Sequence, residues 1–563
     1  MDQSSGIKLV IIFLIILLLK LVFIPFIQAP SAVNDEYVFS KMAQSFFYEG
    51  EFKVHEVPSS QYTPLYPIIL SFSFLANNMQ VVYTLMKLTN LIISSLVIFP
   101  AFLLAREFMK EKHALLSSVI IAFLPSHFIM SHFLLSENLF YPLFLLTFYF
   151  AYKAYTKNNL VNFLFLGILT GFSFLARPTA IAFIPAFIFM FVFQFFKGSF
   201  KIKNLSMLFL SLLVSVFPWF LRNGLNFGWG LSSILGRTYV SDVSSARSFS
   251  PLSYIISVDW VLIYMGVIIL ATLLVFPLFS LLFLKNVGWK SPLPWLFFFT
   301  VFSFLLVAAA HGSSTSPDTE GSVLGRLSHT RHVDQLLPLV VIFGMAGLDS
   351  KRFRKKELLL VLALIVIAIA SIAQLILGSQ RLLPPNNASL TSFGVFFEIL
   401  SLLFSNIGVS LLFITLFIIV AFLMLLLFRR IFPYIFLIFV LITSLAGSVL
   451  VAYNSNAWAD TGHKELGLWL ADRTSPDSLI VYDKESCVDL IQKSDQSGLC
   501  ESGGLFIPSA FWLNSRVIIG SEDDAEGGYF ITSRVLEDKN PVKVFNNFRV
   551  YTFFNGENRS NPL

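Results

Sequence analysis

The sequence predicts an all-α polytopic membrane domain over residues 1–453, followed by a small α/β domain over residues 454–563 outside the membrane. Three observations predict this class. Hydrophobic residues make up 56% of the chain and charged residues only 13%, so the mean hydropathy is +0.77, far above that of a soluble globular protein. Apolar segments of about 20 residues, the length of a membrane-spanning helix, recur up to about Tyr453. From Asn454 onward the chain is polar, with 10 Lys and Arg against 16 Asp and Glu.

About thirteen segments are apolar and long enough to cross the membrane as helices. The first exceeds the apolar core of a signal peptide and lacks an obvious small-residue cleavage site, so we expect it to be retained as a span. The expected spans are residues 7–27, 81–105, 113–131, 138–155, 160–176, 178–196, 204–221, 259–284, 292–311, 335–349, 357–378, 405–428 and 431–453.

The short loops between these spans indicate the orientation. With the N-terminus in the cytoplasm, six basic loops fall on the cytoplasmic side, as the positive-inside rule requires. They carry Arg106/Lys110/Lys112, Lys153/Lys157, Lys197/Lys201/Lys203, Lys285/Lys290, Lys351/Arg352/Arg354/Lys355/Lys356 and Arg429/Arg430. An odd number of spans then places the C-terminal domain on the extracytoplasmic side. We therefore predict a multi-pass protein of the cell membrane, whose pI of 9.1 reflects loops facing anionic lipid and not a nucleic-acid partner.

The C-terminal domain has one helical pattern and four strand patterns. The helix covers residues 464–470, and the strands cover residues 478–482, 516–520, 529–532 and 548–553. The domain has no phosphate-binding glycine fingerprint and no metal-ligand spacing. Capping of the membrane domain and binding of an acceptor both stay open. A disulfide between Cys487 and Cys500 stays open too, because the outer compartment can be oxidising but two cysteines in one domain are also often reduced.

Acidic residues at two places on the predicted outer face are candidate catalytic groups. Asp35-Glu36 follows the first span, and Glu137 opens the span at 138–155. One carboxylate can act as general base towards a hydroxyl nucleophile, and since adjacent residues do not share a helix face, we expect Asp35 rather than Glu36 to do so. Glu137 could position the acceptor, or hold a divalent metal together with Asp35. Capping of a helix N-terminus is the structural alternative for all three.

Basic residues on the same face are candidate ligands of a phosphate. Arg177 and Arg222 each lie at the outer end of a span, and Arg331-His332 precedes the span at 335–349. Guanidinium groups bind phosphate oxygens in a bidentate manner. The alternatives are snorkelling to lipid headgroups for the arginines and a structural hydrogen bond for His332.

Six short motifs stand out in the sequence: Asn34-Asp35-Glu36-Tyr37, Gln61-Tyr62-Thr63-Pro64-Leu65-Tyr66-Pro67, Ser136-Glu137-Asn138, Ala176-Arg177-Pro178-Thr179, Pro218-Trp219 with Arg222-Asn223, and Arg331-His332 before Leu337-Pro338-Leu339. In their order and common sidedness they resemble the membrane glycosyltransferases of GT-C fold. Within that fold the sequence is most similar to the protein O-mannosyltransferase and aminoarabinose transferase group, over most of residues 1–350. His332 departs from the pattern, in which an aromatic Tyr is expected after the Arg.

The resemblance implies an inverting glycosyltransferase. Its donor would be a polyprenyl-phosphate sugar, such as dolichyl phosphate mannose, and its acceptor a hydroxyl of a glycan, lipid or protein outside the cytoplasm. Asp35 would take the acceptor proton, and Arg177, Arg222 or Arg331 would contact the donor phosphate, with less certain contact at His332. The sequence lacks a P-loop and an Asp-x-Asp motif, in agreement with a lipid-linked donor. No cofactor is required on this reading, and a divalent metal stays open.

A different class of membrane protein must be weighed against this one. A transporter or lipid flippase also has many spans, but such proteins usually show internal repeats and ionisable residues near the middle of the membrane. The sequence shows no convincing repeat, and Lys20 and Lys87 lie towards the outer ends of their spans. The third alternative is a structural subunit of a larger assembly, for which Asp35 would not matter.

Overall fold

The computed structural model describes most of the chain. The described residues are 3–31, 33–54, 57–60, 62–230, 251–315, 329–350, 357–377, 430–459, 462–475, 477–486, 507–537, 539–546 and 548–553, with Leu416 and Val420. The predicted span at 405–428 and the two cysteines, Cys487 and Cys500, lie outside this part, apart from the two isolated residues.

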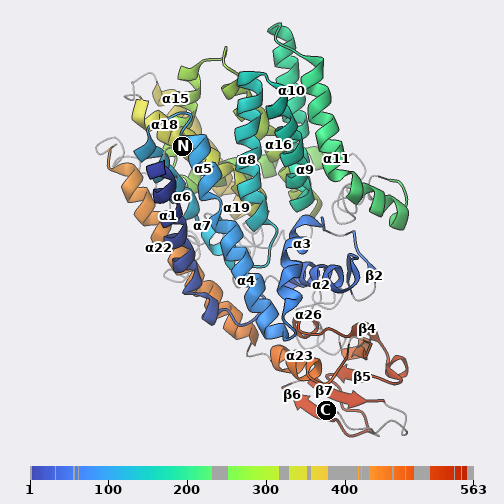
Figure 1. The fold of residues 1–563 in the computed structure, drawn as a ribbon. Coiled ribbons are helices and arrows are strands. Elements are labelled where there is room, and N and C mark those ends of the chain that lie inside the picture. Colours follow the sequence, from blue (N-terminus) through green and yellow to red (C-terminus); the bar gives the residue numbers. More distant parts are fainter. Residues whose placement is uncertain are drawn as a thin grey trace.

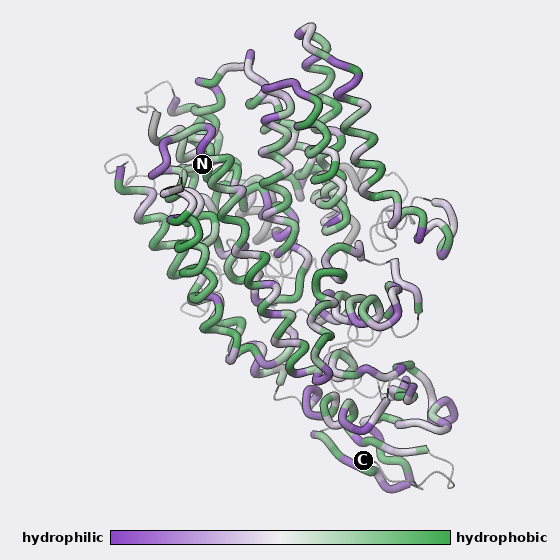
Figure 2. The backbone as a smooth tube through the Cα atoms, in the orientation of Figure 1, coloured by the Kyte–Doolittle hydropathy of each residue, from purple (hydrophilic) through white to green (hydrophobic). Residues whose placement is uncertain are grey.

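A bundle of long apolar helices forms the larger part of the molecule (Figure 1), and hydrophobic residues dominate these helices in Figure 2. The predicted apolar ranges other than 405–428 all coincide with helices. The helices are α1 (Gln3–Leu21), α4 (Met79–Ser95), α5 (Ile98–Ala105), α6 (Glu111–Ala122), α7 (Pro125–Phe128), α8 (Glu137–Lys157), α9 (Leu160–Ala176), α10 (Phe183–Phe196), α11 (Ile202–Phe227), α14 (Pro251–Ala271), α15 (Val275–Val287), α16 (Pro292–Thr315), α18 (Leu337–Ser350), α19 (Leu358–Leu377) and α22 (Phe432–Ala459).

The number of helices that can cross a membrane is smaller than the thirteen expected. Within the described residues six helices are long and apolar enough, or up to eight if each of two bent pairs is one span. The predicted span at 113–131 is bent by 63° at a break after Ala122, and the one at 259–284 is bent by 99°. Four more apolar helices are only 10–17 residues long. The difference arises because apolar composition predicts a helix but does not report its bends or its depth in the bilayer.

Small residues allow the helices around the site to pack closely. α9 lies against α11, and a Cβ atom added at Gly167 would be 1.9 Å from the Ser211 Oγ and 2.4 Å from the Leu208 carbonyl oxygen. Gly171 meets Ser215 in the same way one turn later. Such contacts are typical of helix pairs in membranes, where packing and not water exclusion holds helices together. They fix the end of α9, which leads into Arg177.

A segment with both polar and apolar elements lies between the helical bundle and the C-terminal domain (Figure 1). It contains helix α2 (Val33–Glu49), a hairpin of β1 (Lys53–Val54) and β2 (Val57–Pro58), helix α3 (Leu65–Ser71) and the 3-10 turn η2 (Phe72–Leu75). Asp35 and Glu36 stand in the first turn of α2, where acidic side chains favour the helix dipole. The chain before α2 is tied to α22, since the Ser455 hydroxyl accepts from the Ala29 N–H at 2.9 Å and donates to the Ala29 carbonyl at 2.7 Å.

The C-terminal domain is a mixed sheet with helices, as predicted. Strand order is β4-β3-β5-β7-β6, with β3 parallel to β4 and β5, and β7 antiparallel to β5 and β6. The four predicted strands are present, and the short edge strand β6 is added. The elements are α23 (His463–Ala471), β3 (Leu479–Asp483), α26 (Ile507–Ala510), β4 (Arg516–Gly520), β5 (Tyr529–Thr532), β6 (Lys543–Phe545) and β7 (Phe548–Thr552).

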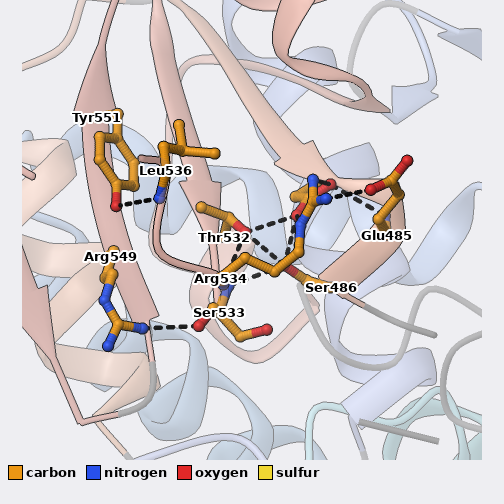
Figure 3. Close-up of polar contacts among 9 residues, drawn as sticks. Glu485, Ser486, Thr532, Ser533, Arg534, Leu536, Arg549 and Tyr551 are labelled. Atoms are coloured by element: carbon orange, nitrogen blue, oxygen red, sulfur yellow. Dashed lines mark hydrogen bonds and ion pairs between the residues drawn. The ribbon is translucent and has the colours of Figure 1, made fainter. Parts of the chain in front are cut away.

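A buried aspartate joins the ends of β3 and β5. The Asp483 carboxylate accepts hydrogen bonds from the Ser486 hydroxyl at 2.7 Å, the Thr532 hydroxyl at 2.6 Å and the Arg534 Nε at 2.8 Å. Arg534 also contacts Glu485 (Figure 3). Burial opposes the charge of Asp483, but the donors from Thr532 and Arg534 outweigh it and hold its pKa below the usual value. These bonds stabilise the strand ends, and we assign the cluster to the scaffold of the domain.

The C-terminal domain is fastened directly to α2. The buried Lys41 ammonium donates to the main-chain carbonyls of Phe511, at 3.1 Å, and Leu513. The Gln44 amide donates to the Asn514 side chain at 2.8 Å. α2, which begins at the predicted catalytic residues, is therefore held from both sides, by the helical bundle and by the C-terminal domain.

Candidate active site

Asp35 lies in the first turn of α2 and binds two partners from distant parts of the chain. Its Oδ2 is 3.0 Å from the Arg331 Nη2, and its Oδ1 accepts a hydrogen bond from the Tyr62 hydroxyl. The side chains of Asp35 and Arg331 are 22% and 21% exposed, so the pair stays within reach of a ligand. Tyr62 is positioned by ring contact with Phe39, at 4.6 Å between centroids, on the following turns of α2.

A second ion pair lies beside the first. Glu137, the first residue of α8, has its Oε1 2.5 Å from the Arg177 Nη1, and both side chains are nearly inaccessible. The same Glu137 oxygen is 3.8 Å from the Arg331 Nε. Asp35, Arg331, Glu137 and Arg177 thus form one chain of alternating charges, which we name the four-charge cluster.

His332 extends this cluster on the Arg177 side. Its Nδ1 is 2.9 Å from the Arg177 Nη2, and its ring stands edge-on to His311 at 4.4 Å between centroids. The side chain is 4% exposed. A neutral imidazole in this position accepts from the guanidinium, so His332 orients Arg177. This is the structural hydrogen bond that the sequence left open for His332.

Local sequence explains why these side chains meet. Glu137 and Asp35 stand at helix starts, and Arg177 is the extended residue, with φ −154° and ψ 122°, between the end of α9 and Pro178. Proline disfavours the helical conformation of the residue before it, so α9 must stop there. Arg331 and His332 close a short 3-10 turn, η6 (His329–His332), before α18. The side chains come from the ends of separate elements, as is common for sites built on a rigid helical scaffold.

The cluster keeps Asp35 ionised. Burial of Asp35 disfavours its charge, but the positive charge of Arg331 and the hydrogen bond from Tyr62 outweigh it, so the pKa of Asp35 lies below its usual value. For Arg331, burial opposes the charge and the carboxylates of Asp35 and Glu137 more than compensate, so its pKa is raised. At neutral pH Asp35 is therefore a carboxylate that can accept a proton.

Glu36 is placed differently from its neighbour. It is fully buried, and its two carboxylate oxygens accept hydrogen bonds from the main-chain N–H groups of Ser31 and Leu134, both at 2.8 Å. These bonds hold the chain before α2 against the segment before α8. Adjacent helix residues point in different directions, so this position does not support the predicted catalytic role of Glu36.

Arg222 contacts main-chain carbonyl groups and aromatic rings away from the four-charge cluster. Its guanidinium donates to the main-chain carbonyls of Ser59, at 2.7 Å, and Phe52, at 2.8 Å, and it lies over the rings of Phe52, Trp219 and Phe227. Its donors therefore fasten the β1–β2 hairpin to α11. The structure does not bring Arg222 into contact with the four-charge cluster, and its contact with a donor phosphate stays a prediction of the sequence.

The residues predicted as metal ligands are occupied by arginines. Asp35 binds Arg331 and Glu137 binds Arg177, so a cation entering between them would meet two guanidinium groups. Across the part of the chain that the structure describes, no group of three His, Cys, Asp or Glu side chains could hold a metal ion. Metal assistance stays a prediction of the sequence.

Two contributors to the site, Tyr62 and His311, were not singled out by sequence reasoning. Tyr62 stood in a quoted motif but had no role assigned, and only its bond to Asp35 reveals one. His311 lies at the end of an apolar run and contacts His332. The sequence offered one signal for His311: it is a polar residue at the end of a predicted span, on the same side of the membrane as the other candidates.

Comparison with known proteins agrees with this fold. Residues 62–221 match the family model described as dolichyl-phosphate-mannose-protein mannosyltransferase. ArnT from Cupriavidus metallidurans bound to undecaprenyl phosphate is similar with a TM-score of 0.61 and 12% identity, over 98% of both chains. ArnT from the same organism in the apo state gives 0.55 and 11%, again over 98% of both chains. No curated protein sequence matches the chain.

These similarities define the fold class. The chain is a multi-pass membrane protein with the GT-C fold of the membrane glycosyltransferases, as its motifs indicated. Its C-terminal mixed sheet is part of that architecture, since the similarity to ArnT runs over almost the whole chain.

Proposed function

We propose that this protein is an inverting glycosyltransferase that moves a sugar from a polyprenyl-phosphate donor to a hydroxyl acceptor on the extracytoplasmic face of the membrane. The single observation that supports this most directly is the pairing of Asp35 with Arg331 and Tyr62 at the start of α2. A carboxylate beside a guanidinium group supports a general base next to a residue that can bind phosphate. The similar ArnT structure was solved with undecaprenyl phosphate, which supports a lipid-phosphate ligand for this chain too.

Asp35 acts as the base in the proposed reaction. The acceptor hydroxyl gives its proton to Asp35 while its oxygen forms a bond to the anomeric carbon of the donor sugar, and the bond from that carbon to the phosphate oxygen breaks. The polyprenyl phosphate leaves with the electron pair of that bond. Because attack and departure occur on opposite sides of the carbon, the anomeric configuration is inverted.

The arginines stabilise the phosphate as it leaves. In the structure the charges of Asp35, Glu137, Arg177 and Arg331 balance, so a bound donor phosphate adds negative charge and competes for the guanidinium groups. As Arg331 turns towards the phosphate, Asp35 loses the main partner that lowers its pKa and becomes a stronger base. Donor binding thereby raises the basicity of Asp35. The arginines stabilise the negative charge that develops on the leaving phosphate, which lowers the activation free energy of transfer.

The orientation predicted from the basic loops supports the proposed side of the reaction. Nucleotide sugars are cytoplasmic, so a site on the opposite face needs a donor that has been carried across on a lipid. The cell membrane is the proposed location, with the N-terminus in the cytoplasm and the C-terminal domain outside. The acceptor is a glycan, lipid or protein hydroxyl.

Transfer from defined donors tests the proposal. The purified protein is incubated with radiolabelled polyprenyl-phosphate mannose, glucose, galactose and aminoarabinose and with acceptors extracted from membranes and envelopes. Label in an acceptor, dependent on the protein, is the expected result. No release of sugar from any of the four donors, together with movement of a polyprenyl phosphate across liposome membranes, would contradict it and favour a flippase.

A further inference from the structure

A cavity of about 410 Å³ lies between α2 and the C-terminal domain and is not used by the four-charge cluster. Its walls come from the second half of α2, from Lys53 on the hairpin, and from Asp477 and residues 514–516 around the start of β4. Its volume is within the range of ligand-binding pockets, roughly 300–1,000 Å³. The C-terminal domain completes this cavity.

The walls offer both hydrogen-bond donors and acceptors. Gln44 and Asn514 present carboxamides, which are fixed by their mutual hydrogen bond of 2.8 Å. Ser45 adds a hydroxyl that is buried, with the residue 8% exposed, and has no hydrogen-bond partner among the described residues. A buried hydroxyl without a partner costs free energy, which a ligand that bonds to it can recover.

The lining of the cavity holds three basic residues, Lys41, Lys53 and Arg516, and two acidic residues, Glu49 and Asp477. Glu49 and Asp477 face Lys53 and Arg516, and Lys53 is paired with Glu49 at 2.9 Å. The deeper Lys41 ammonium is engaged by the Phe511 carbonyl and by the Gln44 oxygen at 3.2 Å. Glu51, which also pairs with Lys53 at 2.8 Å, offsets the third positive charge, so the lining suits a neutral ligand with many hydroxyls.

An aromatic ring borders the cavity as well. Tyr48 lines it and is 55% exposed, with its ring braced against Phe47 and Phe74 at 5.1 and 6.1 Å between centroids. A tyrosine offers a rigid apolar face and a hydroxyl, which matches a sugar ring with its apolar C–H face and polar edge. Carboxamides, a hydroxyl and an aromatic face together are the chemistry of a carbohydrate site.

We infer that this cavity is a subsite for sugar residues of a glycan acceptor, an inference that rests on the proposed glycosyltransferase function and names the acceptor class. Gln44 stands nine positions after Asp35 on the same helix, roughly 14 Å along its axis. A glycan held in the cavity would thus be anchored by its inner residues, while the residue to be modified extends towards Asp35. The C-terminal domain contributes acceptor recognition.

Binding of oligosaccharides in the absence of donor tests the subsite. Saturation-transfer difference NMR is recorded for the purified protein with mannotriose, maltotriose, cellotriose and chitotriose. Binding of at least one by the wild type is expected. The variant Ser45→Trp, which fills the cavity, and Tyr48→Ala, which removes a ring from its wall, should each weaken that binding at least about tenfold. Asp523→Trp, on the exposed surface of the same domain, serves as the matched control for added bulk and should bind normally.

The outcomes separate this inference from the function on which it rests. No binding of any of the four probes, or equal binding by wild type and Tyr48→Ala, overturns the subsite whether or not transfer occurs. Loss of binding in Ser45→Trp supports the subsite only if this variant melts at the same temperature as the wild type. If it melts at a lower temperature, the binding measured for Tyr48→Ala tests the subsite instead. Failure of donor turnover with intact, Tyr48-dependent glycan binding contradicts the proposed transferase but leaves a carbohydrate site.

Discussion

Glu137 and Arg177 form a buried ion pair, with 2.5 Å between Oε1 and Nη1 and exposures of 4% and 6%. Each residue begins or ends a helix, so the pair couples the start of α8 to the end of α9. Because Glu137 also approaches Arg331, the pair sets the position of the arginine that holds Asp35. A charge pair of this kind can serve both the fold and the reaction.

Replacing one residue of the Glu137–Arg177 pair should lower the free energy of unfolding more than replacing both. Glu137→Leu leaves Arg177 buried without its carboxylate, and Arg177→Met leaves Glu137 with only the longer contact to Arg331. Loss of one partner of a buried pair costs about 3–5 kcal/mol, whereas the double variant leaves neither charge. We expect both single variants to melt at lower temperature than the double variant. Thermal unfolding of the four proteins in one detergent measures this. Additive losses in the double variant would show that the two charges are not coupled.

Tyr62 should set the lower pH limit of activity. Its hydroxyl donates to Asp35 and helps to lower the pKa of that carboxyl, so Tyr62→Phe raises the pKa. A base with a depressed pKa loses its charge only as pH falls through that low value, so the acidic limb of kcat/KM lies at lower pH in the wild type than an unperturbed aspartate would give. In Tyr62→Phe the limb should move to higher pH. An unchanged limb would mean that Asp35 is not the titrating group.

Arg222 and Arg331 should differ in their effects on the donor. Arg331→Ala removes a proposed phosphate contact and should weaken binding of a polyprenyl phosphate by at least about tenfold. Arg222→Ala should leave that affinity within about threefold, but expose the hairpin around residues 52–59 to faster proteolysis, because two carbonyl contacts are lost. Arg222→Lys should restore the hairpin only in part, since an ammonium does not bridge both carbonyls as a fork does. If both alanine variants lose donor affinity equally, Arg222 also binds the donor phosphate.

Lys41 should make stability depend on pH. Burial lowers the pKa of Lys41 to about 7, so between pH 7 and the usual lysine value near 10.4 the unfolded chain binds a proton that the folded protein does not. Stability of the wild type should therefore rise with pH through this window. Lys41→Met should lose that part of the slope, which melting temperatures at pH 7, 8 and 9 will show. Lys484→Met, at an exposed lysine, is the control, and equal slopes in wild type and Lys41→Met would contradict the assignment.

The sequence predicted the fold class well because its signals are local. Apolar runs and charged loops report helices in lipid, and the strands of the C-terminal domain stand in short apolar runs such as residues 479–482. The bend of 99° between α14 and α15 could not be predicted, since it depends on packing and not on composition. The short strand β6 was missed because an exposed edge strand shows little apolar pattern.

The site was predicted in part for the same reason. Asp35, Glu137, Arg177 and Arg331 could be selected as unusual charges on one side of the membrane, and the structure brings them together. Glu36 and Arg222 met the same criterion but bind main-chain groups, which a single sequence does not reveal. The partner of each charge depends on long-range packing, which local sequence signals do not report.

The central claim is that Asp35 is the catalytic base, and Asp35→Asn tests it most directly. The substitution keeps the size of the side chain and removes its basicity. Transfer from the donor that the wild type uses should fall by at least about 100-fold, as expected for loss of a general base, while polyprenyl-phosphate binding and melting temperature are retained. Asp472→Asn, at an exposed carboxylate of the C-terminal domain, should transfer at the wild-type rate. Transfer by Asp35→Asn within tenfold of the wild type would contradict the proposed mechanism.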